Sequence, residues 1–96
     1  MQIEFMSQKW QVRPAEPREL PQDTLGLCDP KTNTIILDPE LQGWPKCQTL
    51  FHEIFHIWEM TMNQGLTEQQ VDTMAAALLH CLRENPELIR MIEEQE

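Results

Sequence analysis

Residues 46–62 read KCQTLFHEIFHIWEMTM, and this stretch decides the fold because its apolar side chains repeat with the period of an α-helix. The apolar positions on one side of that helix are Leu50, Ile54, Ile57 and Trp58, with Phe51 and Phe55 beside them. The stretch follows Pro45 and stops before Asn63 and Gly65, which are residue types that end helices. The sequence therefore predicts one amphipathic helix over 46–62.

This helix contains His52-Glu-Ile-Phe-His56, an H-E-x-x-H motif. Two histidines four residues apart lie on one helix face, so both imidazoles can reach a single Zn²⁺, and Glu53 is placed to take a proton from a bound water. Burying these polar groups among apolar neighbours is costly unless they bind a metal or find hydrogen-bond partners. The motif predicts a zinc site with Glu53 as general base; the alternative is a pair of ordinary surface or core histidines without metal.

A second helix is predicted after Thr67, because Thr67 and Gln70 have the spacing of a capping box. Its apolar positions repeat at three and four residues: Val71, Met74, Ala75, Leu78 and Leu82. Asn85-Pro86 ends that repeat, and Pro86 is expected in the first turn of a short third helix.

The third zinc ligand is expected on the second helix, because a catalytic zinc usually has three protein ligands and a water. Glu68 shares a face with the apolar stripe, and Asp72 follows one turn later. Glu68 as ligand leaves Asp72 to accept the free N–H of an imidazole. Two alternatives stay open: Asp72 is the ligand, or Glu68 only complements the helix dipole. Glu59 is interpreted as a solvated charge.

The first half of the chain is cut by six prolines into short pieces, which leaves room only for short strands and turns. Residues 25–28 and 34–37, joined by the turn-rich 29–33, predict a β-hairpin. A further strand is expected near 9–13. The fold class is therefore α+β in a single domain, 1–96, with a small N-terminal sheet packed on the H-E-x-x-H helix and on the second, ligand-bearing helix.

The charge narrows the range of partners. The chain has 96 residues, with seven Lys and Arg against sixteen Asp and Glu, and its net charge is −9. Nucleic acids and anionic membranes are disfavoured, because both are bound mainly through cationic side chains. No run approaches the roughly 18 apolar residues of a membrane span, and the first ten residues lack the apolar core of a signal peptide. A cytoplasmic protein is expected.

The succession of strand 34–37, helix 49–56 and second helix 66–79 resembles the minimal zincin domain of the ImmA/IrrE metallopeptidases, in particular their short, stand-alone phage and prophage members. The resemblance implies His52 and His56 as zinc ligands, Glu53 as general base and an acidic third ligand on the second helix. Glu68-x-x-x-Asp72 is also similar to the E-x-x-x-D of thermolysin-like zincins, which favours Glu68 as that ligand. At Gln70 the chain departs from longer family members, which often have Glu.

The resemblance further implies a substrate-binding edge strand, formed by Thr34, Ile35, Ile36 and Leu37, against which an extended peptide could pair. The expected function is that of a zinc-dependent metallo-endopeptidase acting on a regulatory protein. The negative charge would favour a basic polypeptide as substrate or partner. The alternative is a non-catalytic, zinc-stabilised protein-interaction module with the same fold.

Overall fold

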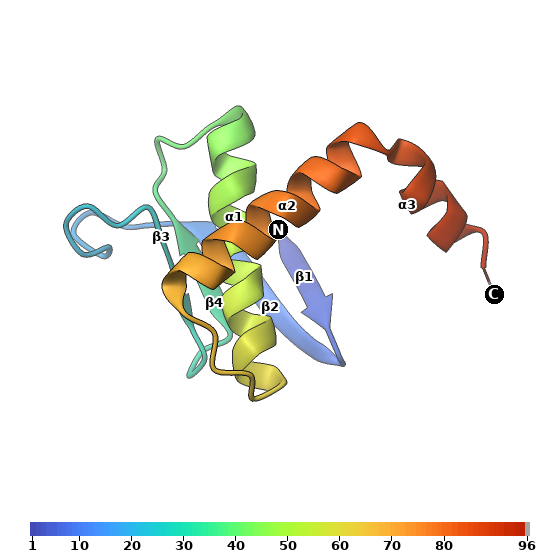
Figure 1. The fold of residues 1–96 in the computed structure, drawn as a ribbon. Helices are drawn as coiled ribbons and strands as arrows, with labels where there is room; N and C mark the ends of the chain where they lie inside the picture. The colour runs from blue at the N-terminus through green and yellow to red at the C-terminus, as the bar shows by residue number, and fades with distance from the viewer. Residues whose placement is uncertain (96) are drawn as a thin grey trace.

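Four strands and three helices follow one another along residues 1–95, the part of the chain that the computed structural model describes (Figure 1). The strands are β1 (Gln2–Phe5), β2 (Gln8–Pro14), β3 (Gly26–Asp29) and β4 (Thr34–Leu37). The helices are α1 (Gly43–Thr61), α2 (Glu68–Glu84) and α3 (Pro86–Glu93). The predicted α+β class is confirmed, with every predicted helix present.

The sheet has the strand order β1-β2-β4-β3. The predicted hairpin is confirmed, because β3 pairs antiparallel with β4 from Gly26 opposite Leu37 to Asp29 opposite Thr34. The expected strand near 9–13 is β2, which pairs parallel with β4. β1 was not predicted; it joins β2 through Met6 and Ser7, both at positive φ (49° and 69°), a turn without the glycine that usually marks it.

The prediction that Thr34–Leu37 forms an edge strand is wrong. β4 lies inside the sheet, with β2 on one side and β3 on the other, so its backbone groups are paired within the protein. Its apolar run explains the position: Ile35, Ile36 and Leu37 are 0%, 5% and 3% exposed, as in a central strand covered on both faces. The sheet edge nearest α1 is β3.

The helices form two layers over one face of the sheet. α1 packs on the sheet through Ile57, which joins a core cluster with Trp10, Val12, Ile35 and Leu37. α2 packs on α1 through a second cluster of Phe55, Val71 and Ala75. Among residues 1–95, α2 contacts α1 and α3 but no strand, and in Figure 1 it crosses in front of α1 with the sheet behind. The interface with α1 is therefore the main contact that positions α2.

Local sequence signals set the helix ends. α1 begins at Gly43, three residues earlier than predicted, because Pro45 is tolerated in the first turn, where its missing N–H has no helical partner to lose. The predicted capping box of α2 is confirmed: Thr67 Oγ1 accepts from the Gln70 N–H at 3.1 Å, and Gln70 Oε1 accepts from the Thr67 N–H at 2.9 Å. This box fixes Glu68 as the first residue of α2.

Candidate metal centre

Two histidines of α1 and one carboxylate of α2 converge where the helices cross. His52 Nε2 lies 2.7 Å from Glu68 Oε1 and 3.1 Å from His56 Nε2, and His56 Nε2 lies 3.2 Å from Glu68 Oε1. Ligands of a tetrahedral metal with bonds of about 2.0–2.1 Å are separated by about 3.3 Å. The three atoms are therefore close to that spacing, and the group could hold a metal ion.

The other nitrogen of each ring is held by a carboxylate. His52 Nδ1 lies 2.5 Å from Asp72 Oδ1, and His56 Nδ1 lies 2.9 Å from Glu59 Oε1. An ionised carboxylate can only accept, so both Nδ1 atoms carry the proton of the ring. In the neutral tautomer each Nε2 then presents a lone pair to Glu68.

Three electron-rich atoms face one another in this arrangement. They repel unless a cation stands between them or an imidazole takes up a second proton. A divalent metal between the three atoms would remove this repulsion, because imidazole nitrogens and a carboxylate oxygen are ordinary ligands of such ions. The donor set thus fits a metal, and protons compete with the metal for the same lone pairs.

The structure distinguishes the two acidic candidates on α2. Glu68 is on the Nε2 side of both histidines, whereas Asp72 accepts from His52 on the far side of the ring, as expected for a carboxylate that fixes the tautomer. Glu68 also starts the helix, so the dipole interpretation is compatible with this position. Glu68 as the metal ligand stays a prediction.

The interpretation of Glu59 as a solvated charge is wrong. Its side chain is only 15% exposed, and it accepts from His56 Nδ1 and, at 2.6 Å, from the backbone N–H of Leu66. Its place three residues after His56, on the same helix face, was the sequence signal that could have identified it.

The contacts between the imidazoles and the carboxylates shift the pKa values of both partners. Burial raises the pKa of the Glu68 carboxyl, but its contacts with the imidazoles of His56 and His52 outweigh burial, so the pKa lies below its usual value of 4.5. Burial lowers the pKa of His56, but the bonds to Glu59 and Glu68 prevail and place it above 6.5. The hydrogen bond to His56 also lowers the pKa of Glu59. The site therefore stabilises positive charge at His56.

Glu53 lies beside this group and is 6% exposed. Burial raises the pKa of its carboxyl group, while the nearby His52 and His56 oppose that rise. The thiol of Cys28 on β3 lies against the carboxylate, and burial together with that negative charge raises the pKa of the thiol to about 12. Cys28 is therefore a neutral neighbour of Glu53 and not a thiolate ligand.

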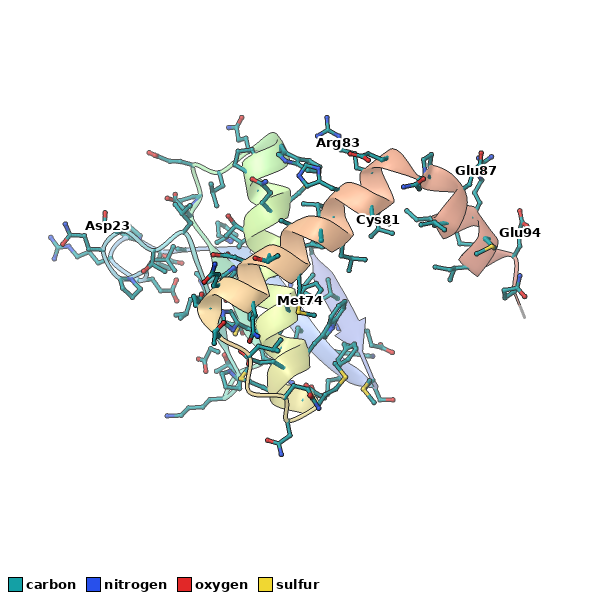
Figure 2. All side chains as sticks on the ribbon, viewed as in Figure 1. Asp23, Met74, Cys81, Arg83, Glu87 and Glu94 are labelled. Carbon is teal, nitrogen blue, oxygen red and sulfur yellow. The ribbon has the colours of Figure 1, made fainter. Side chains whose placement is uncertain are left out.

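An open pocket of about 410 Å³ lies in front of these residues. One wall comes from the loop before β3 and from the start of β3, and the other walls come from α1 and α2. Its lining residues are Asp23, Thr24, Leu25, Gly26, Gln48, Thr49, His52, Glu53, Glu68 and Asp72. Figure 2 places Asp23 on the loop that projects beside the sheet. No pattern in the sequence indicated this wall, because the loop lies far from the motif along the chain.

The wall depends on a close approach of β3 to α1. A Cβ atom at Gly26 would lie 2.8 Å from Thr49 Cγ2 and 3.4 Å from Glu53 Cγ. Only a residue without a side chain lets the strand lie this near to Glu53. Thr34–Leu37, the predicted substrate strand, contributes no lining residue to this pocket.

His80, the third histidine, is placed away from the centre. Its ring contacts Trp44 edge-on, with the centroids 5.2 Å apart, and Arg83 Cζ lies 4.3 Å from the centroid of the same Trp44 ring. This group joins the start of α1 to the end of α2, which is a structural role.

Comparison with known protein families, with curated proteins and with solved structures finds no match for this chain. None of the described helices is both long enough and apolar enough to pass through a membrane. Conclusions about function therefore rest on the chemistry of the site.

Proposed function

We propose that this chain is a zinc-dependent metallo-endopeptidase, in which His52, His56 and Glu68 bind the metal and Glu53 is the general base. One observation carries the proposal: two imidazole lone pairs and a carboxylate oxygen converge within 3.2 Å, beside a buried carboxylate that borders an open pocket. The resemblance to the ImmA/IrrE metallopeptidases supports the same assignment.

A zinc ion bound there would supply a Lewis acid that brings the pKa of a water to about 7 and polarises a carbonyl oxygen. Glu53 takes the proton of the attacking water and passes it to the leaving amine. Its raised pKa suits both steps, because a group that accepts and returns a proton works best when its pKa approaches the ambient pH. Asp72 and Glu59 hold the imidazoles in the tautomer that leaves Nε2 free.

The substrate is proposed to be an extended polypeptide that pairs with β3. This edge strand replaces the strand at 34–37 in that role, because β3 has an unpaired side and its first residue, Gly26, lines the pocket. Backbone hydrogen bonds to β3 would lay the scissile bond across the site. We further propose that the substrate is a regulatory protein, as the family resemblance implies.

The pocket favours basic side chains on the substrate. Of its four carboxylates, Glu68 and Asp72 would be balanced by the charge of a divalent metal, and Asp23 and Glu53 would remain. Within residues 1–95, no Lys or Arg lines the pocket, and the chain as a whole carries a net charge of −9. A Lys or Arg near the scissile bond would therefore be attracted to the cleft.

The alternative is a non-catalytic module in which zinc only joins the helices. The position of the group favours this alternative, because its members come from both α1 and α2 and a bound ion would join the two helices. Against it, the group among the described residues has three members and not the four of a closed structural site. A structural site also has no use for a buried carboxylate at position 53.

The deciding experiment compares the zinc-loaded wild type with Glu53→Gln on a mixed peptide library, with new chain ends identified by mass spectrometry. We expect wild-type cleavage next to basic residues, and a loss of at least about 10²-fold in Glu53→Gln with zinc still bound. Glu40→Gln, an exposed change outside the pocket, is the control. A wild type that binds zinc and cuts nothing would favour the module, and equal activity in Glu53→Gln would refute the general base.

A further inference from the structure

Among residues 1–95, the apolar side of α3 is left largely exposed. Leu88, Ile89 and Ile92 share one face of the helix by their three- and four-residue spacing, and Ile89 and Ile92 are 42% and 67% exposed. No residue of α3 is buried, and within residues 1–95 the helix contacts only α2. Figure 1 shows α3 extending away from the sheet and from α1.

This extension is not explained by packing within the chain. An eight-residue helix is marginal by itself, and short helices in proteins are normally stabilised by burying their apolar side. The radius of gyration is 14.0 Å, whereas a chain of 96 residues folded into one compact body has about 12.5 Å. Exposed apolar side chains grouped in this way are typical of a binding surface.

The charge around the apolar face selects the partner. Residues 84–94 carry four carboxylates, from Glu84, Glu87, Glu93 and Glu94, against the single cation of Arg90. Figure 2 shows Glu87 on α3 and Glu94 just past its end. A second copy of this chain would bring the same negative charge to the contact and be repelled, as would an anionic membrane.

We propose that α3 is a docking surface for a basic amphipathic helix of a partner protein. The apolar side of that helix would cover Leu88, Ile89 and Ile92, and its Lys and Arg residues would pair with the surrounding glutamates. This surface is separate from the metal centre, because the 17 residues of α2 span about 25 Å between Glu68 and the start of α3. A partner could therefore be held there while the pocket stays open, whether or not the chain is a peptidase.

The test uses an 18-residue peptide of Leu and Lys arranged with helical period, labelled for fluorescence anisotropy and added to the full chain. We expect binding that weakens with added salt and that is lost at least about tenfold in Ile89→Glu/Ile92→Glu. This variant is more negative than the wild type, so non-specific charge attraction would strengthen its binding. Ile92→Gln alone, at the most exposed position of the face, should weaken binding without a change of charge.

The matched control is Met60→Glu/Met62→Glu, which makes the same charge change at side chains that are 46% and 47% exposed near the end of α1. It should bind the peptide as well as the wild type does. Equal or tighter binding by the α3 variants would overturn the proposal. It would also be overturned if sedimentation showed a dimer that the α3 variants abolish, or if vesicles of neutral lipid bound the wild type through the same residues.

Discussion

Glu59 accepts a hydrogen bond from His56 Nδ1 at 2.9 Å, and its second oxygen accepts the backbone N–H of Leu66 at 2.6 Å. One carboxylate thus fixes the orientation of a candidate metal ligand and ties the end of α1 to the loop that leads into α2. The position of His56 relative to Glu68 therefore depends on a residue outside the H-E-x-x-H motif.

Replacing Glu59 by alanine should weaken zinc binding by about 10- to 100-fold, because His56 loses the partner that sets its tautomer and ring orientation. Competition with a chromogenic chelator measures the affinity. Glu84→Ala, a loss of one exposed carboxylate at the end of α2, should leave it unchanged. An affinity equal to that of the wild type would mean that Glu59 has no part in the site.

Removal of the metal should destabilise the fold, because the site joins α1 to α2 and α2 has no contact with the sheet among the described residues. Free zinc at about 100 times Kd contributes about 2.7 kcal/mol. At about 4–8 °C per kcal/mol, a chelator should lower Tm by about 10–20 °C, measured by circular dichroism. In Glu53→Gln, which keeps all three proposed ligands, the chelator should lower Tm by the same amount as in the wild type. In His56→Ala it should lower Tm much less; an equal decrease there would mean that the metal binds elsewhere.

The substitution Gly26→Ala should lower the free energy of unfolding by about 1–3 kcal/mol, because the added Cβ would lie 2.8 Å from Thr49 Cγ2. Thr49→Ser removes that methyl group and keeps the hydroxyl that donates to the Pro45 carbonyl at 2.9 Å. The double variant Gly26→Ala/Thr49→Ser should therefore recover much of the loss in urea denaturation. Gly65→Ala is the control, because no neighbouring atom of the described residues lies within 4 Å of a Cβ at that position. Additive effects of the two changes would exclude a steric conflict between these side chains.

The pair Arg13–Glu19 should make stability depend on pH in the acid range. The two terminal guanidinium nitrogens of Arg13 donate to the Glu19 carboxylate, at 2.8 and 2.5 Å, and these hydrogen bonds lower the pKa of Glu19 from 4.5 to about 2. Because the folded-state pKa is the lower one, this stabilisation is present above about pH 4.5 and is lost as the pH falls toward 2. The stability difference between wild type and Glu19→Gln, measured by urea unfolding, should shrink across that range. A constant difference would contradict the shift.

The sequence by itself determined the local elements. Three local signals act within a few residues: the capping box at Thr67 and Gln70, the helical period of residues 46–62, and the turn-rich link between residues 28 and 34. The predicted helices and hairpin are present, with α1 beginning three residues earlier than predicted. The i, i+4 spacing of His52 and His56 brings their Nε2 atoms together on α1. These features follow from the geometry of one helix or one hairpin.

The tertiary structure alone decided which groups meet across elements. β4 became a central strand because β2 pairs parallel with it. These two strands are far apart along the chain, with β3 and its flanking loops between them. Glu68 and Asp72 took opposite sides of His52 because α2 packs against α1 with both residues beside that ring. Such placements depend on the packing of distant surfaces, so periodicity and spacing along the chain could not specify them.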